Sequence, residues 1–272
     1  MSLIIVMLIS MIFYNIPMNL TKGILILCYV CTPNSNYYTL SKLNQLLDNL
    51  RHDSISLFLF NIRSIPKNVA IVNDFLYTLN NSPDILAITE TKLNNNNVIN
   101  VNLANYNLFH TDSPTIAGGA GLYISKVLQY IYSLDLKFSI PLVESCWSEI
   151  ISGKNKPSVV VGWIYRHSSP NLQEFTSELE SIIKQLNKKK HEVFILGDMN
   201  IDYLKYNEHS NTEEYLDMLY LNNFLLLITE PTRVTDRSST LIDHVYSNTP
   251  IQNIVSGIAL IDISDNLPHL VN

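Results

Sequence analysis

Short apolar runs alternate along this chain with segments whose apolar residues recur at helical spacing. Residues 56–60, 85–88 and 193–196 are runs of the first kind and suit buried strands. Residues 172–186 repeat leucine, isoleucine and phenylalanine on one side and form the clearest amphipathic helix. Because such helices and strands bury their apolar faces against one another in layers, the alternation favours an α/β fold.

The rest of the chain divides into segments of the same two types. Helices are predicted around residues 40–50, 69–79 and 212–221. The middle and later parts favour strands, at residues 118–125, 147–151, 158–165, 225–228, 242–246 and 254–260. This mixture predicts two mixed β-sheets packed face to face with helices outside, a four-layer α/β sandwich.

The composition is that of a folded protein with an acidic balance. A chain of 272 residues is an ordinary length for one α/β domain, and 47% of its residues are hydrophobic. The net charge of −6 excludes a protein that holds nucleic acid by a broad basic surface. The one dense basic run, Lys188–Lys190, is typical of a solvated helix end. Attraction for a polyanionic substrate therefore has to come largely from a bound cation.

The first residues are apolar and differ from the rest. Residues 1–20 contain no Lys or Arg, whereas a signal peptide normally opens with positive charge. Two asparagines and a proline interrupt the run, and a membrane-spanning helix needs about 20 apolar residues. A membrane anchor and a flanking segment without a role both stay open. We therefore divide the chain into an N-terminal segment of uncertain role, residues 1–37, and one domain, residues 38–272.

Polar residues follow or end the predicted strands. Side chains at strand ends can converge on one edge of a sheet sandwich, where a rigid core holds them and a ligand can reach them. Carboxylate and amide oxygens suit Mg²⁺ or Mn²⁺, and no His/Cys grouping in the sequence suits zinc. Each residue alone is more often a turn-capping group, but the set recurs in order down one chain: Asn61, Glu90, Tyr165, Asp198, Asn200, Asp243 and Asp265.

The ordered set lies in motifs that resemble a known superfamily. These motifs are residues 60–64 (FNIRS), 88–93 (ITETKL), 118–124 (GGAGLYI), 165–166 (YR), 197–202 (GDMNID), 230–233 (EPTR), 241–244 (LIDH) and 264–268 (SDNLP). In this order and at these separations, they resemble the endonuclease/exonuclease/phosphatase superfamily. More narrowly, they resemble the apurinic-endonuclease-like domain of LINE-type (non-LTR) retrotransposons. The resemblance implies a DNase I-like fold and metal-dependent hydrolysis of a phosphodiester in DNA.

The resemblance also implies a role for each matching residue. Glu90, helped by Asn61 and Asp265, would hold the divalent cation against the scissile phosphate. Asp198 would position or activate the attacking water. Asn200 would orient Asp198 and contact the phosphate. The implied cofactor is Mg²⁺ or Mn²⁺, with no small-molecule cofactor.

The other matching residues would act on the phosphate or its surroundings. Tyr165 would stabilise charge that develops on the phosphoryl oxygens or the leaving group. Asp243 would support the catalytic histidine of the family, as a carboxylate orients an imidazole elsewhere. Thr232 and Arg233 are assigned either to the substrate backbone or to a structural turn.

The chain departs from the family at the position of that histidine. The family has Ser-Asp-His where this chain has Ser264, Asp265 and Asn266. Asparagine can hydrogen-bond a phosphate oxygen, but it has no imidazolium charge and exchanges no proton near pH 7. Loss of such a group typically lowers a rate by about 10²–10⁴. His269, three positions later, could replace it only if the loop were redrawn.

Three functions remain open. The first is a Mg²⁺-dependent DNA-nicking endonuclease with weak activity, monomeric, nuclear and of weak to moderate, cation-dependent affinity for DNA. The second is a catalytically silent relict that binds metal or nucleic acid, which fits a decayed or fragmentary retroelement copy. The third is a phospholipid or inositol-phosphate phosphodiesterase, membrane-associated through residues 1–20. The YR, GDMNID and LIDH motifs favour the retroelement branch. DNA target preference has no readable signal.

Overall fold

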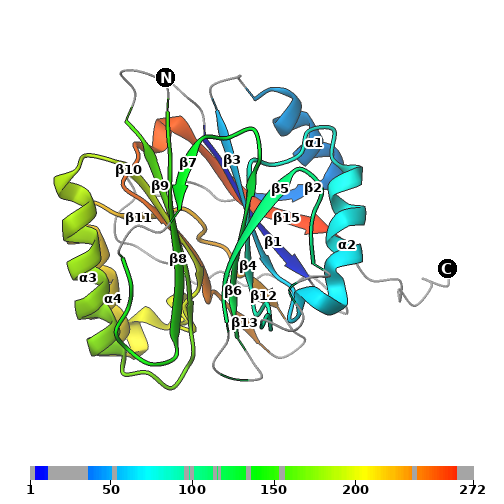
Figure 1. Cartoon of the computed structure of the whole chain (residues 1–272). Helices are drawn as coiled ribbons and strands as arrows, with labels where there is room; N and C mark the ends of the chain where they lie inside the picture. The colour runs from blue at the N-terminus through cyan, green and yellow to red at the C-terminus, as the bar shows by residue number, and fades with distance from the viewer. Residues whose placement is uncertain are drawn as a thin grey trace.

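The computed structural model describes residues 4–11, 36–50, 54–94, 98, 101–112, 115, 118–132, 136–152, 157–234 and 238–261. These residues form two β-sheets that pack face to face, with helices on the two outer faces (Figure 1). The predicted α/β sandwich of two mixed sheets flanked by helices is therefore confirmed.

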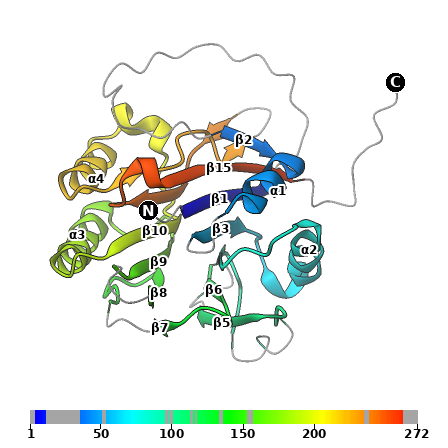
Figure 2. The same cartoon turned by 90° about the horizontal axis from the view of Figure 1, so that it is seen from above.

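The first sheet has seven strands, in the order β2-β15-β1-β3-β4-β6-β5. Helices α1 (Leu40–Asp48) and α2 (Ile65–Thr78) cover its outer face (Figure 2). Its strands are β1 (Ile4–Met11), β2 (Asn36–Thr39), β3 (Ile55–Asn61), β4 (Ile85–Thr89), β5 (Tyr106–Thr111), β6 (Ala120–Ser125) and β15 (Ile254–Ile261).

The second sheet has six strands, in the order β11-β14-β10-β9-β8-β7. Helices α3 (Leu172–Lys188) and α4 (Ser210–Leu221) pack on its outer face. Two 3₁₀ helices, η2 (Tyr203–Glu208) and η3 (Ile251–Asn253), lie in the connections. The strands are β7 (Tyr130–Tyr132), β8 (Val143–Ile150), β9 (Val159–Arg166), β10 (Glu192–Asp198), β11 (Leu225–Leu226) and β14 (Asp243–Ser247).

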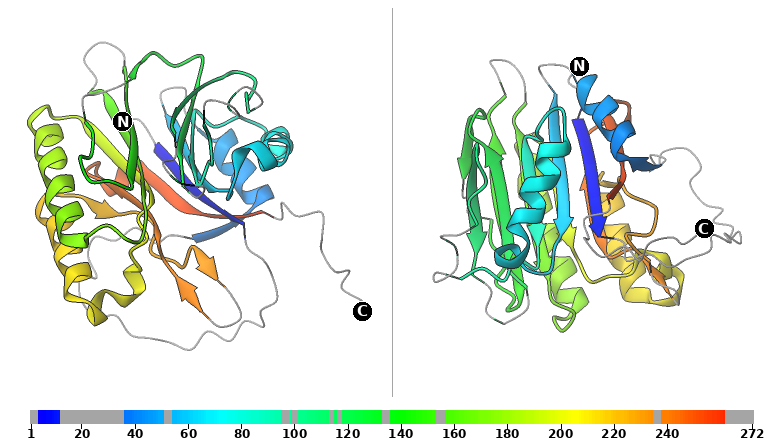
Figure 3. Two further views of the ribbon diagram at one scale, coloured as in Figure 1. Left: turned by 60° about the horizontal axis from the view of Figure 1, so that its bottom comes forward. Right: turned by 90° about the vertical axis from the view of Figure 1, so that its right-hand side faces the viewer.

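A separate two-stranded hairpin, β12 (Arg233–Val234) and β13 (Ser239–Thr240), stands at one end of the sandwich (Figure 3). The short apolar runs predicted as strands became β3, β4 and β10, because each is covered on both faces. Phe58 and Phe60 of β3 pack against Phe75 of α2, while Leu57 and Leu59 face the second sheet. Successive side chains of a strand point to opposite faces, so one strand contributes to two apolar layers.

The segment Ile4–Met11 is a strand in the centre of the first sheet. It pairs in parallel with β15 on one side, Ile4 opposite Ile254, and with β3 on the other, Ile4 opposite Ile55. Near-continuous apolar sequence is typical of a strand with neighbours on both sides and cover on both faces. From the sequence, a membrane anchor and a flank without a role were the two alternatives for this segment, and a strand was not predicted. Residues 12–35 lie outside the described residues.

Candidate active site

The register of the second sheet brings three polar side chains into one row. In β10, Asp198 lies opposite Tyr165 of β9 on one side and opposite Asp243 of β14 on the other. All three side chains are buried. Residues opposite each other in neighbouring strands project from the same face of a sheet. The row Tyr165–Asp198–Asp243 therefore presents one polar edge toward the first sheet.

The sequence placed Asp243 at the C-terminal end of its strand, and this placement was wrong. Asp243 is the first residue of β14. The residue still reaches the site because β14 runs antiparallel to β10, which puts the start of β14 beside the end of β10.

The first sheet contributes Asn61 and Glu90 to the same place. Asn61 ends β3 and lies opposite Thr89 of β4, and Glu90 follows directly. The Asn61 amide Nδ2 donates a hydrogen bond to Asp198 Oδ2 at 3.3 Å, which joins the two sheets at their polar edge. Glu90 has a φ of 54°, in the left-handed region that costs a non-glycine residue about 1–3 kcal/mol. The polar ends of β3, β4, β9 and β10 thus meet in one site.

A tight turn after β10 orients Asp198. The backbone N–H of Asn200 donates to Asp198 Oδ1 at 3.0 Å, and the Asn200 side chain donates to the carbonyl of Arg166 at 2.7 Å. The buried Arg166 guanidinium donates to the carbonyl of Met199 at 3.1 Å. These reciprocal bonds tie the end of β9 to the turn. Asn200 therefore orients Asp198 through its backbone N–H. The amide nitrogen of its side chain is hydrogen-bonded within the protein, to the Arg166 carbonyl.

Gly197 lets β10 end in this turn, and Gly197→Ala should destabilise the protein. Gly197 has a φ of +146°, and a Cβ there would lie 1.8 Å from the carbonyl oxygen of Ile164. We expect a loss of about 3 kcal/mol or more in the free energy of unfolding, measured by urea denaturation. The volume-conserving control Met199→Leu, at a buried neighbour, should cost under about 1.5 kcal/mol. Equal losses of unfolding free energy in the two variants would contradict a specific steric requirement for glycine at position 197.

Thr232 and Arg233 take different places. Thr232 is buried, and its hydroxyl donates to Asp243 Oδ2 at 3.0 Å, so it orients that carboxylate. Arg233 begins the hairpin β12–β13 with a side chain that is 42% exposed, and its Nη2 lies 3.9 Å from Glu90 Oε1. Thr232 is therefore an internal contact, whereas Arg233 borders the site on the solvent side.

The carboxyl groups at the centre of the site each disfavour the ionised form of the other. Burial and the neighbouring Asp243 carboxylate raise the pKa of Asp198 well above its ordinary value. Burial also raises the pKa of Asp243, against the opposing effects of the Thr232 and Asn61 hydrogen bonds. Burial raises the pKa of Tyr165, and the carboxylates of Asp198 and Glu90 raise it further. Tyr165 is therefore a neutral phenol at pH 7.

A divalent cation fits this donor set. The site is built from carboxylate, amide and hydroxyl oxygens, which are the ligands of hard cations. Asp243 Oδ1 is buried and has no hydrogen-bond partner among the described residues. Within the same residues, no three acidic, histidine or cysteine side chains form a metal-binding group on their own. Asp265, the third predicted ligand, and Asn266 lie outside the described part of the chain.

The structure adds a buried Glu144–His167 pair that was not predicted from the sequence. Glu144 of β8 lies opposite Tyr165, and its Oε1 is 3.0 Å from His167 Nε2. The signal was a glutamate within a largely apolar segment, together with a histidine two positions after Tyr165. Only the register of β8 against β9 connects them.

His244, the residue after Asp243, lies outside the site. It is fully buried, with its ring nitrogens 3.0 Å from the Leu241 carbonyl and from the Tyr246 hydroxyl. Burial lowers the pKa of His244 to about 4 from an ordinary 6.5.

This buried neutral imidazole predicts a loss of stability in acid. Between pH 6.5 and 4 the unfolded chain binds a proton at His244 that the folded chain does not bind, so stability falls as the pH falls. The loss should reach about 3 kcal/mol, at about 1.4 kcal/mol per pH unit. Urea denaturation at pH 7, 5.5 and 4.5 measures it, with His244→Gln as the reference. Parallel pH profiles for the two proteins would contradict the assignment.

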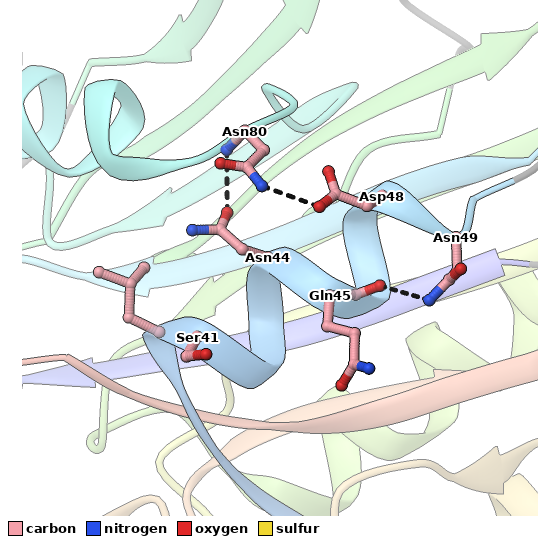
Figure 4. A pocket seen from close by; sticks show the side chains of 7 residues that line it. Ser41, Asn44, Gln45, Asp48, Asn49 and Asn80 are labelled. Carbon is pink, nitrogen blue, oxygen red and sulfur yellow. Dashed lines mark hydrogen bonds between the residues drawn. The ribbon is translucent and has the colours of Figure 1, made fainter.

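Figure 4 shows a polar pocket that contains none of these site residues. It lies between α1 and Asn80, which follows α2. Asn80 Nδ2 donates to Asp48 Oδ2 at 2.8 Å, and the Asn80 N–H donates to Asn44 Oδ1 at 2.9 Å. These residues precede β3 and β4, so the pocket lies at the opposite end of those strands from Asn61 and Glu90.

Comparisons with known proteins agree with this architecture. Residues 58–265, more than half of the chain, match the model of the Endonuclease/Exonuclease/phosphatase family. The endonuclease domain of TRAS1, a telomere-specific non-LTR retrotransposon, is 13% identical with a TM-score of 0.51, over 70% of this chain and 84% of that chain. A search of curated proteins gives no significant match.

Two further solved structures share the fold. A 3'-5' exonuclease from Neisseria meningitidis is 18% identical with a TM-score of 0.52, over 70% of this chain and 86% of that chain. An AP endonuclease from Archaeoglobus fulgidus is 17% identical with a TM-score of 0.50, over 70% of this chain and 85% of that chain. At these identities the likeness shows the fold, and the predicted DNase I-like class is confirmed.

Proposed function

We propose that this chain, which belongs to the endonuclease/exonuclease/phosphatase family, is a Mg²⁺-dependent phosphodiesterase domain of retrotransposon type that acts on DNA. We further propose that its rate is low because Asn266 stands at the position of the catalytic histidine. The observation that carries the proposal is the hydrogen bond between Asn61 of the first sheet and Asp198 of the second. It joins the two sheets at the edge to which Glu90, Tyr165 and Asp243 also belong.

The proposed cation site uses Glu90 and Asn61, with Asp265 as the third ligand. Mg²⁺ or Mn²⁺ bound there supplies positive charge to the scissile phosphate. Glu90 is held in a left-handed conformation at the end of β4 and Asn61 at the end of β3, so the fold presets both side chains. Arg233, whose Nη2 lies 3.9 Å from Glu90 Oε1, offers a further positive charge on the solvent side of the site.

Asp198 is the proposed proton acceptor for the attacking water. Its raised pKa makes it a better base than an exposed carboxylate. The Asn200 N–H and the Asn61 amide hold its two oxygens in place. Tyr165, neutral and adjacent in the sheet, donates a hydrogen bond to a phosphoryl oxygen as negative charge develops there.

A silent relict domain is the second candidate, and Asn266 favours it. Asparagine supplies neither the positive charge nor the proton of an imidazolium. The phospholipid branch has less support, because the motifs around Tyr165, Asp198 and Asp243 follow the retroelement pattern. Within the described residues, no helix combines the length and apolar character that crossing a membrane requires.

A supercoiled-plasmid nicking assay tests the proposed function. The wild-type chain is compared with and without Mg²⁺, and with Asp198→Ala as the matched inactive variant. We expect slow nicking that requires Mg²⁺ and disappears in Asp198→Ala. Nicking that persists in Asp198→Ala would place the chemistry elsewhere. No nicking in any form, at protein concentrations that bind the plasmid, would favour the silent domain.

A further inference from the structure

Glu144 and His167 form a buried ion pair at the site edge of the second sheet. Glu144 is 6% exposed, His167 is 14% exposed, and 3.0 Å separates Glu144 Oε1 from His167 Nε2. An unpaired carboxylate would be costly at this depth, and burial raises the pKa of Glu144, so the contact with the His167 ring offsets part of the cost of burying it. The pair is thus a buried contact that fixes the His167 ring from inside the protein.

Further contacts fix Glu144. Its carboxylate accepts hydrogen bonds from the backbone N–H of Gly119 and from the Thr111 hydroxyl, the latter at 3.4 Å. Gly118 has a φ of +106°, and a Cβ there would lie 2.8 Å from His167 Nε2 and 2.9 Å from Glu144 Oε1. The glycine therefore leaves the space in which the pair forms.

The same loop ties the pair to the turn that carries Glu90. The Gly119 carbonyl accepts from the Thr91 N–H at 3.1 Å, and the Gly118 carbonyl accepts from the Lys92 N–H at 2.8 Å. A continuous run of contacts thus joins His167, Glu144 and the residues that follow Glu90. The pair is held rigidly relative to the proposed cation site.

His167 also lies against Tyr165. The two rings meet edge to face, with centroids 4.8 Å apart and planes at 84°. Because Nε2 points toward Glu144, the other ring nitrogen, Nδ1, is turned away from that carboxylate. The His167 ring therefore lies against the phenol that is proposed to contact the scissile phosphate.

We infer that His167 binds a backbone phosphate of DNA next to the scissile one, with Glu144 as its buried counter-ion. This inference rests on the proposed function. A chain with a net charge of −6 does not attract a polyanion over its whole surface. A phosphate contact therefore has to come from individual side chains at the site. A phosphodiester anion is the ligand that matches an imidazole N–H next to a neutral phenol.

The chain contains a matched control pair at the other end of the same sheet. His191 Nδ1 lies 3.9 Å from Glu149 Oε1, and the two side chains are 15% and 17% exposed. His191 precedes β10, whereas His167 follows β9, which runs parallel to it. His191→Gln therefore removes a histidine of similar setting away from the site.

The test measures binding of a fluorescent DNA duplex by anisotropy across a salt series, with Ca²⁺ in place of Mg²⁺ and the probe checked for cleavage. In His167→Gln the affinity should fall about tenfold or more. The slope of log affinity against log salt should become shallower by about one phosphate contact. Glu144→Gln should also lower the affinity and make the salt slope shallower. His167→Arg should restore the wild-type salt slope. His191→Gln should match the wild type.

The outcomes separate this inference from the proposed function. An unchanged affinity and slope in His167→Gln would overturn the inference, as would an equal loss in His191→Gln. Circular dichroism of each variant shows that it is folded, and His167→Asn is the second variant if His167→Gln is not. In an actively nicking background, His167→Gln should raise KM more than it lowers kcat. Binding that depends on His167 without nicking in any variant would refute the activity alone.

Discussion

Asn266→His is expected to raise the rate of Mg²⁺-dependent plasmid nicking by about 10²–10⁴-fold. The substitution restores an imidazole at the position where this chain has an amide. Asp243, which would orient that imidazole, is already in place, buried and fixed by the Thr232 hydroxyl. Single-turnover nicking of a supercoiled plasmid measures the rate.

A matched variant shows whether the gain comes from the imidazole. Asn266→Gln keeps the amide and changes the side-chain length, and it should leave the rate within a fewfold of the wild type. In the Asn266→His background, Asp243→Asn should remove most of the gain, because the new histidine loses its carboxylate partner. No increase in Asn266→His would mean that more than this position has been lost.

Asp198→Asn is expected to abolish nicking and, in the absence of metal, to stabilise the fold. The amide cannot accept a proton from water, so the rate in the Asn266→His background should fall by about 10²–10⁴-fold. Burial and Asp243 raise the pKa of Asp198, so its stabilising contribution is present in acid and is lost as the pH rises through that pKa. At pH 7 the carboxylate therefore costs stability.

Urea denaturation in EDTA at pH 7 checks the second half of this prediction. Asp198→Asn should unfold at a higher urea concentration than the wild type, because it removes the buried charge that Asp243 opposes. Mg²⁺ should reduce the difference in stability between Asp198→Asn and the wild type, because a cation stabilises the wild-type carboxylates. Asp198→Ala is the control, since it removes the charge but also the oxygen that accepts from Asn200. A less stable Asp198→Asn would mean that the carboxylates do not repel one another as described.

The sequence predicts the layers of this fold because burial leaves a local signal. The covered strands β3, β4 and β10 are apolar runs, and α3 buries the five residues Phe175, Leu179, Ile182, Ile183 and Leu186 that mark its face. Apart from β11, the edge strands carry no such signal. The short strands β5 and β7 and the hairpin β12–β13 have mixed burial, so they were not predicted.

Part of the candidate site could be predicted and part could not. Motif order identifies Asn61, Glu90 and Asp198, because each sits at or just past the end of an apolar strand. The sequence gives no strand direction for Asp243, which approaches from an antiparallel strand. Glu144 and His167 meet only through the register of β8 against β9. Pairing across strands is set by the whole sheet, and a single sequence does not record it.

The central place of β1 in the first sheet makes assembly of that sheet a late event. Ile4 pairs with Ile254, 250 positions further along the chain (254 − 4), and β1 is also the strand that joins β15 and β2 to β3. Local helices and the β3–β4 pair can form early, whereas the sheet becomes continuous only when these distant segments meet. Such long-range closure slows folding and leaves strand edges uncovered in the meantime. The protein should therefore depend on protection from aggregation while it folds.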